Sequence, residues 1–204
     1  GPRTSTNSST DGTDSNFVLN RTKVKFKKEG GTYQDYTADA SSIRFPNSGI
    51  DRDIFVGYHD VTEYVKANGG GKYYLGNLGA TIGTMSSGTG YFGGWSLVVV
   101  YANPELKWRD ITVFDGYAYV DGESNSPAQY LNISGFEAAQ AGEVNIDLGI
   151  MAGEGDVSIS GDYFRIKRRA NSTYVDLGNT GNVIETGGFF NSTINTSGRL
   201  PSNK

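Results

Sequence analysis

The sequence predicts an all-β fold, a β-sandwich of two antiparallel sheets with one or two short helices. The apolar runs have strand length rather than helix length. The chain also has 29 glycines, 13 tyrosines and 10 phenylalanines without a fixed period, which suits many short strands joined by tight turns. At 204 residues it is long enough to bury one core, and because it has no cysteine we expect packing or bound ions to stabilise it.

The centre of the expected core is the near-continuous apolar run at residues 95–101, which contains three consecutive β-branched valines. This pattern predicts a buried strand. Asn103 and Pro104 follow, and because proline lacks the N–H that a β-ladder uses, we expect the chain to reverse there. Residues 111–120 resume an apolar pattern and are expected to pair with the first strand.

Polar segments flank the expected β-sandwich module, which spans residues 17–195. Residues 1–16 are low in complexity and predict a flexible tail or loop, and residues 196–204 predict a polar C-terminal tail. Within the module, Lys23–Lys28 alternate basic and apolar residues and predict a strand that returns as a hairpin over residues 33–38. We interpret the lysines as a solvated strand face or edge.

One segment has the pattern of a short helix. Asp60 is a candidate N-cap, Glu63 stands three residues later as in a capping box, and Asn68-Gly69 supplies the stop. Further short strands are expected before and after the central pair, each bounded by turn residues: 72–78, 130–133, 144–151, 157–159, 163–167 and 173–177.

Composition argues against several functions. The net charge of −4 argues against nucleic-acid binding as the main task, and without an apolar run of 18 residues we expect no membrane insertion. Gly88 to Gly93 match G-x-G-x-x-G but precede a strand, whereas a dinucleotide site requires a helix there. The single histidine, His59, lacks a nucleophile motif, so we interpret it as structural and expect no catalysis.

The motifs GGWSLVVVY, ITVFDGY and GEGDVSISGDYF resemble a β-sandwich module of very large secreted or surface-anchored bacterial proteins, many of them adhesins. The resemblance covers roughly residues 17–195 and implies an extracellular, non-catalytic domain, with neighbouring domains in the same protein. Some sandwich domains of such adhesins bind peptides or sugars through calcium. Family members usually have a further strand at each end, so we expect an incomplete module whose open sheet edge takes a strand from another chain.

A calcium site is predicted where oxygen donors are densest, at Glu154, Asp156 and Asp162, because calcium takes six to eight oxygen ligands and glycine lets backbone carbonyls turn inward. Acidic residues that merely cap a hairpin would give the same pattern. Lesser candidates are Asp51 with Asp53 and Asp115 with Asp121.

Aromatic residues in or beside glycine- or proline-containing loops are candidate platforms for sugars or peptide side chains. Tyrosines at alternate strand positions also cover core edges, so both interpretations stay open. The candidates are Tyr73, Tyr74, Tyr91, Phe92 and Trp108.

The sequence thus predicts a non-catalytic adhesin module that binds a peptide or a carbohydrate on another cell or surface, with calcium. A structural spacer of a long surface protein is the first alternative. The second is a carbohydrate-active enzyme, which would need a cleft with paired carboxylates.

Overall fold

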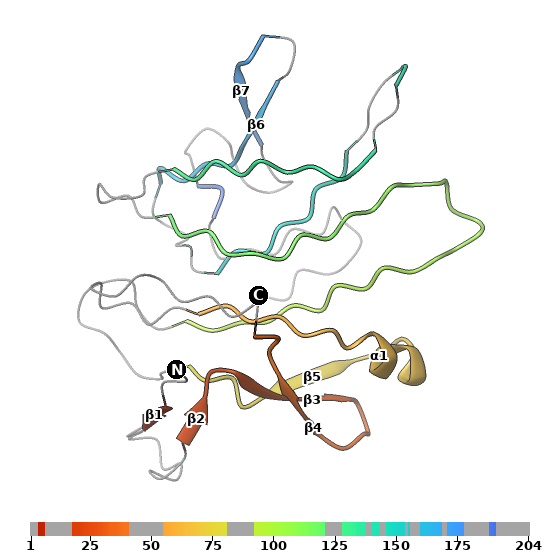
Figure 1. Ribbon diagram of the computed structural model, residues 1–204, viewed down its shortest axis with the longest axis vertical. Helices are drawn as coiled ribbons and strands as arrows, with labels where there is room; N and C mark the ends of the chain where they lie inside the picture. The colour runs from red at the N-terminus through yellow and green to blue at the C-terminus, as the bar shows by residue number, and fades with distance from the viewer. Residues whose placement is uncertain are drawn as a thin grey trace. The chain divides into compact units, whose positions relative to one another are not determined.

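The computed structural model describes eleven stretches of the chain, and side chains are described from residue 20 onward (Figure 1). The chain divides into two compact units, Gly1–Leu148 and Gly149–Lys204, which we describe separately. The described stretches are 4–6, 18–40, 55–80, 92–120, 128–137, 140–142, 146–153, 155, 160–168, 171–177 and 188–190.

The first unit contains a three-stranded antiparallel sheet of order β4-β3-β5. Strand β3 (Lys23–Lys28) pairs with β4 (Gln34–Thr37) and β5 (Tyr73–Gly76), with Phe26 opposite Gln34 on one side and Leu75 on the other. All three strands were predicted from the alternating pattern and the glycine turns, and their positions are confirmed. Gly30 has a φ of 77°, the left-handed conformation that a tight hairpin turn uses and glycine adopts without strain.

A second pair, β1 (Thr4–Thr6) and β2 (Val18–Asn20), is also antiparallel. Strand β1 lies within residues 1–16, where a tail or loop was predicted, so three of those residues have a different structure from the one expected. Polar, low-complexity sequence gives no periodicity from which a three-residue strand can be recognised.

Helix α1 (Thr62–Asn68) confirms the predicted helix but corrects its start. The N-cap is Val61 and not Asp60. Asp60 precedes the N-cap, and its carboxylate accepts a hydrogen bond of 2.8 Å from the Thr62 N–H. Glu63 does not complete a capping box and instead pairs with Lys66 at 2.9 Å. The predicted stop holds, because Gly69, with φ 69°, donates its N–H to the Val65 carbonyl.

Phe26 on β3 is the centre of the packing between the sheet and α1 and is 4% exposed. Its ring stacks on Tyr73 with centroids 5.4 Å apart and an interplanar angle of 8°. Three other rings meet it edge-on, those of Tyr36, Tyr64 and Trp95. Each such pair contributes about 0.5–1.5 kcal/mol beyond its burial, so these five residues, the aromatic cluster, hold α1 on the sheet.

The structure corrects the prediction of core strands at residues 95–101 and 111–120. The chain reverses after Asn103, as predicted, with the Leu106 N–H on the Asn103 carbonyl at 3.1 Å (Figure 1). Neither segment has a strand assignment, and Val98 and Tyr101 are 65% and 67% exposed. β-Branched residues favour an extended backbone, but a strand is buried only if another segment packs over it. The sequence of the run itself does not show whether such a segment exists.

The second unit contains one antiparallel pair, β6 (Arg165–Lys167) and β7 (Tyr174–Asp176), which confirms two more predicted strands. Phe164 and Phe189 pack beside it with ring centroids 5.5 Å apart. Two further strands were expected at 130–133, in the first unit, and at 144–151, which runs from the first unit into the second. Their described residues, 130–133 and 146–151, have no strand assignment, and residues 144–145 and 157–159 lie outside the described residues. A mostly β fold with antiparallel sheets is therefore shown, and face-to-face packing of two sheets stays a prediction.

Candidate functional site

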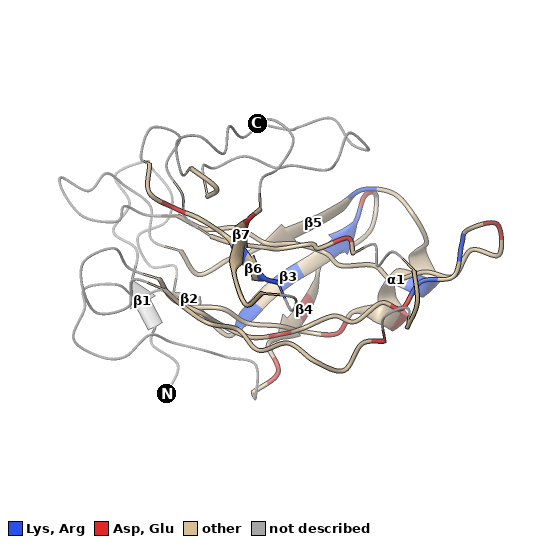
Figure 2. Cartoon of the chain, turned by 90° about the horizontal axis from the view of Figure 1, so that it is seen from above, with Lys and Arg blue, Asp and Glu red and all other residues tan. Residues whose placement is uncertain are grey.

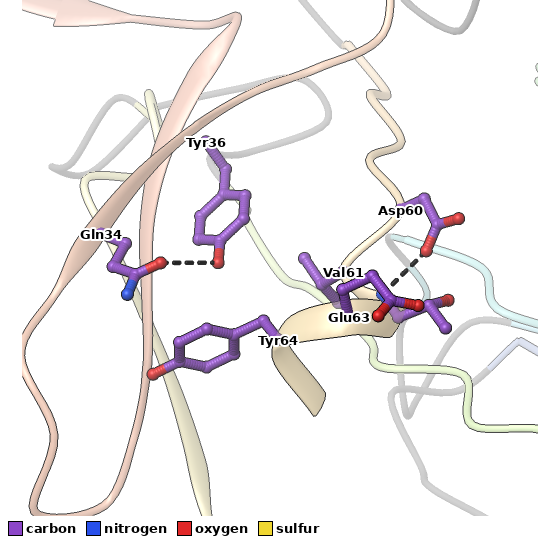
Figure 3. Close-up of a pocket in the computed structure, with 7 residues that line it drawn as sticks. Gln34, Tyr36, Asp60, Val61, Glu63 and Tyr64 are labelled. Atoms are coloured by element: carbon purple, nitrogen blue, oxygen red, sulfur yellow. Dashed lines mark hydrogen bonds between the residues drawn. The ribbon is translucent and has the colours of Figure 1, made fainter. Parts of the chain in front are cut away.

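A pocket of about 490 Å³ opens where β4 meets the start of α1. We call it the α1–β4 pocket. Alternation along β4 places Gln34 and Tyr36 on the sheet face that carries Phe26, and α1 directs Tyr64 toward the same face. The pocket is lined by Gln34, Tyr36, Asp60, Val61, Thr62, Glu63 and Tyr64 (Figure 3).

Two tyrosine rings form the aromatic part of the pocket. The Tyr36 and Tyr64 rings meet edge-to-face with centroids 6.2 Å apart. Tyr36 donates its hydroxyl to Gln34 Oε1 at 3.1 Å (Figure 3). The Tyr64 hydroxyl accepts a hydrogen bond from the Lys28 backbone N–H at 3.0 Å. These bonds fix both rings from their polar ends and leave ring surface toward the pocket.

Two carboxylates form the polar side of the pocket. Hydrogen bonds from the hydroxyl and the backbone N–H of Thr62 hold the pKa of Asp60 below its usual range, so this group is an anionic acceptor at neutral pH. Glu63 is exposed and has an ion pair with Lys66. Burial raises the pKa of Tyr36, which therefore stays a neutral phenol. The pocket thus offers acceptors for a ligand that carries hydroxyl or amide donors.

The lone histidine lies behind this pocket. The His59 ring meets Tyr36 with centroids 5.2 Å apart, and its Nδ1 is 3.3 Å from an Asp39 carboxylate oxygen. Both contacts hold the imidazole beside β4, and the structural role expected from the sequence stays a prediction.

The four aromatic candidates that the structure describes lie in different surroundings. Tyr73 packs in the aromatic cluster and donates its hydroxyl to the Gly69 carbonyl, whereas Tyr74, the next residue, faces the other side of the sheet. Phe92 is exposed, and Trp108 is 97% exposed beside the chain reversal. Tyr91 lies outside the described residues.

The calcium candidates are described only in part. Glu154 and Asp156 lie outside the described residues, and Asp162 is half-buried in an isolated parallel bridge to Gly188. Its backbone carbonyl faces the Phe189 N–H at 3.4 Å. Among the weaker candidates Asp115 is exposed, and Asp51, Asp53 and Asp121 lie outside the described part. Within that part, no three His, Asp or Glu side chains are grouped as a metal site requires.

Sequence reasoning missed Gln34, Tyr36 and Tyr64 as site residues. The available signal was the predicted pairing of a hairpin with a helix, since alternate β4 residues and the apolar face of α1 must meet if the helix covers the sheet. That signal locates a junction, but the opening appears only in three dimensions.

Comparison of the chain with protein-family models, with curated proteins and with solved structures found no match. No helix in the described part of the chain is long and apolar enough to cross a membrane.

Proposed function

We propose that the chain is a non-catalytic binding module of a secreted or surface-anchored bacterial adhesin, and that it takes a carbohydrate or peptide ligand in the α1–β4 pocket. The observation that carries this proposal is the convergence of two fixed tyrosine rings with two carboxylates around an opening of about 490 Å³. Small ligands are bound in openings of this size, lined by aromatic surface and a few polar groups. The motifs at residues 93–101, 111–117 and 153–164 support the assignment to a bacterial surface protein.

The ionisation of Asp60 suits it as a hydrogen-bond acceptor for a ligand and makes it unsuited to serve as a general acid. Asp60 and Glu63 both line the pocket, as the enzyme alternative requires, but glycoside hydrolysis needs one carboxyl group whose raised pKa keeps it protonated as the general acid. The pKa of Asp60 is lowered by Thr62. An ionised Asp60 accepts a hydrogen bond from a ligand and has no proton to give.

Glycan and peptide arrays test the proposal. The wild-type chain is expected to bind a restricted set of glycans or peptides, and Gln34→Ala with Asp60→Asn is expected to weaken that binding at least tenfold. Thr37→Ala is the matched control, because Thr37 is exposed on the opposite face of β4 and makes no contact with the pocket. Absence of any ligand on both arrays would instead favour the structural spacer.

Calcium at Glu154, Asp156 and Asp162 belongs to the same proposal as a stabilising ion. Three carboxylates suit a hard cation, and glycine directly precedes each of them in the sequence, at positions 153, 155 and 161. A β-strand from another chain is a further proposed partner. In the described sheet β4 and β5 are the outer strands, and a strand added to either would satisfy main-chain groups at the edge.

A further inference from the structure

The sheet face opposite α1 carries a row of lysines along β3. Alternation places Lys23, Lys25 and Lys27 on this face, while Val24 and Phe26 face the helix side. Alternate residues of a strand are about 6.8 Å apart, so the Cα atoms of the three lysines lie at regular intervals, and Figure 2 shows basic positions in blue along β3. Lysines often protect exposed strand edges, but β3 is the central strand of its sheet, so edge protection does not explain them.

Two tyrosines flank this row. The Lys27 ammonium lies 4.6 Å from the Tyr33 ring centroid and 5.9 Å from that of Tyr74. A Cβ added at Gly76 would lie in ordinary van der Waals contact with Tyr33 ring carbons, at 3.6 and 3.7 Å, so the ring packs directly over this glycine on β5 and a branched side chain there would extend into it. Tyr33 and Tyr74 are 41% and 39% exposed, which leaves aromatic surface accessible beside the lysines.

Positive charge exceeds negative charge on this face, although the whole chain carries −4. Lys25 pairs with Asp35 at 2.8 Å and Lys72 lies 3.9 Å from Glu29. Lys23 and Lys27 have no carboxylate within ion-pair distance in the described part of the chain. Because the Lys25–Asp35 pair is solvent-exposed, it contributes little to stability, and an incoming anion can compete for Lys25.

We propose that these residues, the lysine–tyrosine face (Lys23, Lys25, Lys27, Tyr33 and Tyr74), bind an acidic polysaccharide. Its sulfate or carboxylate groups lie at the lysines, which act as point charges, and a sugar ring packs on Tyr33. The site is separate from the α1–β4 pocket, because the two lie on opposite faces of the sheet.

The carboxylates on this face favour a glycan over a nucleic acid. Asp35 and Glu29 flank the lysine row, and Glu29 already accepts the Tyr74 hydroxyl at 3.1 Å. Such groups accept hydrogen bonds from sugar hydroxyls, which a polysaccharide offers along its whole length. They repel any polyanion, so they do not themselves separate the two ligands by charge, but single-stranded DNA offers few hydroxyl donors to these acceptors and depends on cations that neutralise successive phosphates.

Calorimetric titration of the full chain with heparin, polygalacturonate, neutral dextran and oligo-dT tests this site. We expect at least one of the two acidic polysaccharides to bind, with an affinity that falls as salt rises, and dextran not to bind. Lys23→Gln with Lys27→Gln should weaken binding at least tenfold. Gly76→Val, which keeps every charge but displaces the Tyr33 ring, should weaken it at least threefold, with folding checked by circular dichroism.

Lys66→Gln on α1 is the matched control, because it removes the same charge from an exposed residue of the helix. It should change the affinity less than twofold. The proposal is wrong if neither acidic polysaccharide binds at low salt, if oligo-dT binds more tightly than both, or if Lys66→Gln weakens binding as much per charge as the β3 variants. Loss of array binding in the pocket variants would leave this result unchanged, so the two sites can fail independently.

Discussion

Replacement of Phe26 by alanine tests the packing that positions the pocket. Phe26 is 4% exposed and touches four rings of the aromatic cluster, with centroid distances from 5.4 to 6.0 Å. Removal of a buried phenylalanine costs about 3–5 kcal/mol through lost transfer energy and the cavity left behind. We expect the free energy of unfolding to fall by about that amount.

Urea unfolding followed by tryptophan fluorescence is the assay. Trp95 contacts Phe26 and reports the cluster, whereas Trp108 is 97% exposed and reports little. Val24→Ala is the matched control on the same face of β3, where the side chain is half-buried, and it should cost about 1 kcal/mol because fewer buried methyl groups are removed. A loss below 1 kcal/mol for Phe26→Ala, or one equal to that of Val24→Ala, would refute the reasoning.

Three other predictions concern single features. Asp60→Ala should lower the melting temperature above pH 4 and leave it unchanged near pH 2. The pKa of Asp60 in the folded chain is held below the unfolded value of about 3.9, so the ionised group stabilises the fold above that pH, and this stabilisation is lost as the pH falls through the folded-state pKa. An equal loss at both pH values would contradict this. Trp108→Ala should change the free energy of unfolding by less than about 0.5 kcal/mol in the same urea assay, because the side chain is 97% exposed, and a larger loss would mean that the indole is buried. Millimolar calcium should raise the melting temperature of the wild type, measured by calorimetry, but not that of Asp156→Asn with Asp162→Asn; an equal rise in both would place the ion elsewhere.

Local pattern was enough for the elements whose signals are short-range. The Lys23–Lys28 alternation, the turn at Gly30 and the Asn68-Gly69 stop each act within a few residues, and β3, β4 and α1 were predicted from them. Burial was not predictable in the same way. The run at residues 95–101 is apolar enough for a core strand, yet its exposure depends on which segment covers it, a property of the whole fold.

The candidate site shows the same division. Tyr64 lies within the helix that the sequence predicts, but its role depends on the Lys28 N–H, which belongs to a strand far away in sequence. The β3 lysines were interpreted as a solvated face or edge, and only the sheet order shows that β3 is central. The function of a residue thus depends on long-range pairing, even where its secondary structure can be predicted from its sequence neighbours.

An NMR titration of the isotope-labelled chain with the tightest ligand from the arrays tests the central claim most directly. The account predicts that the largest chemical-shift changes map to Gln34, Tyr36 and residues 60–64, and that Gln34→Ala with Asp60→Asn abolishes them. Changes confined to other residues, with these signals unmoved at saturation, would contradict the assignment of ligand binding to the α1–β4 pocket.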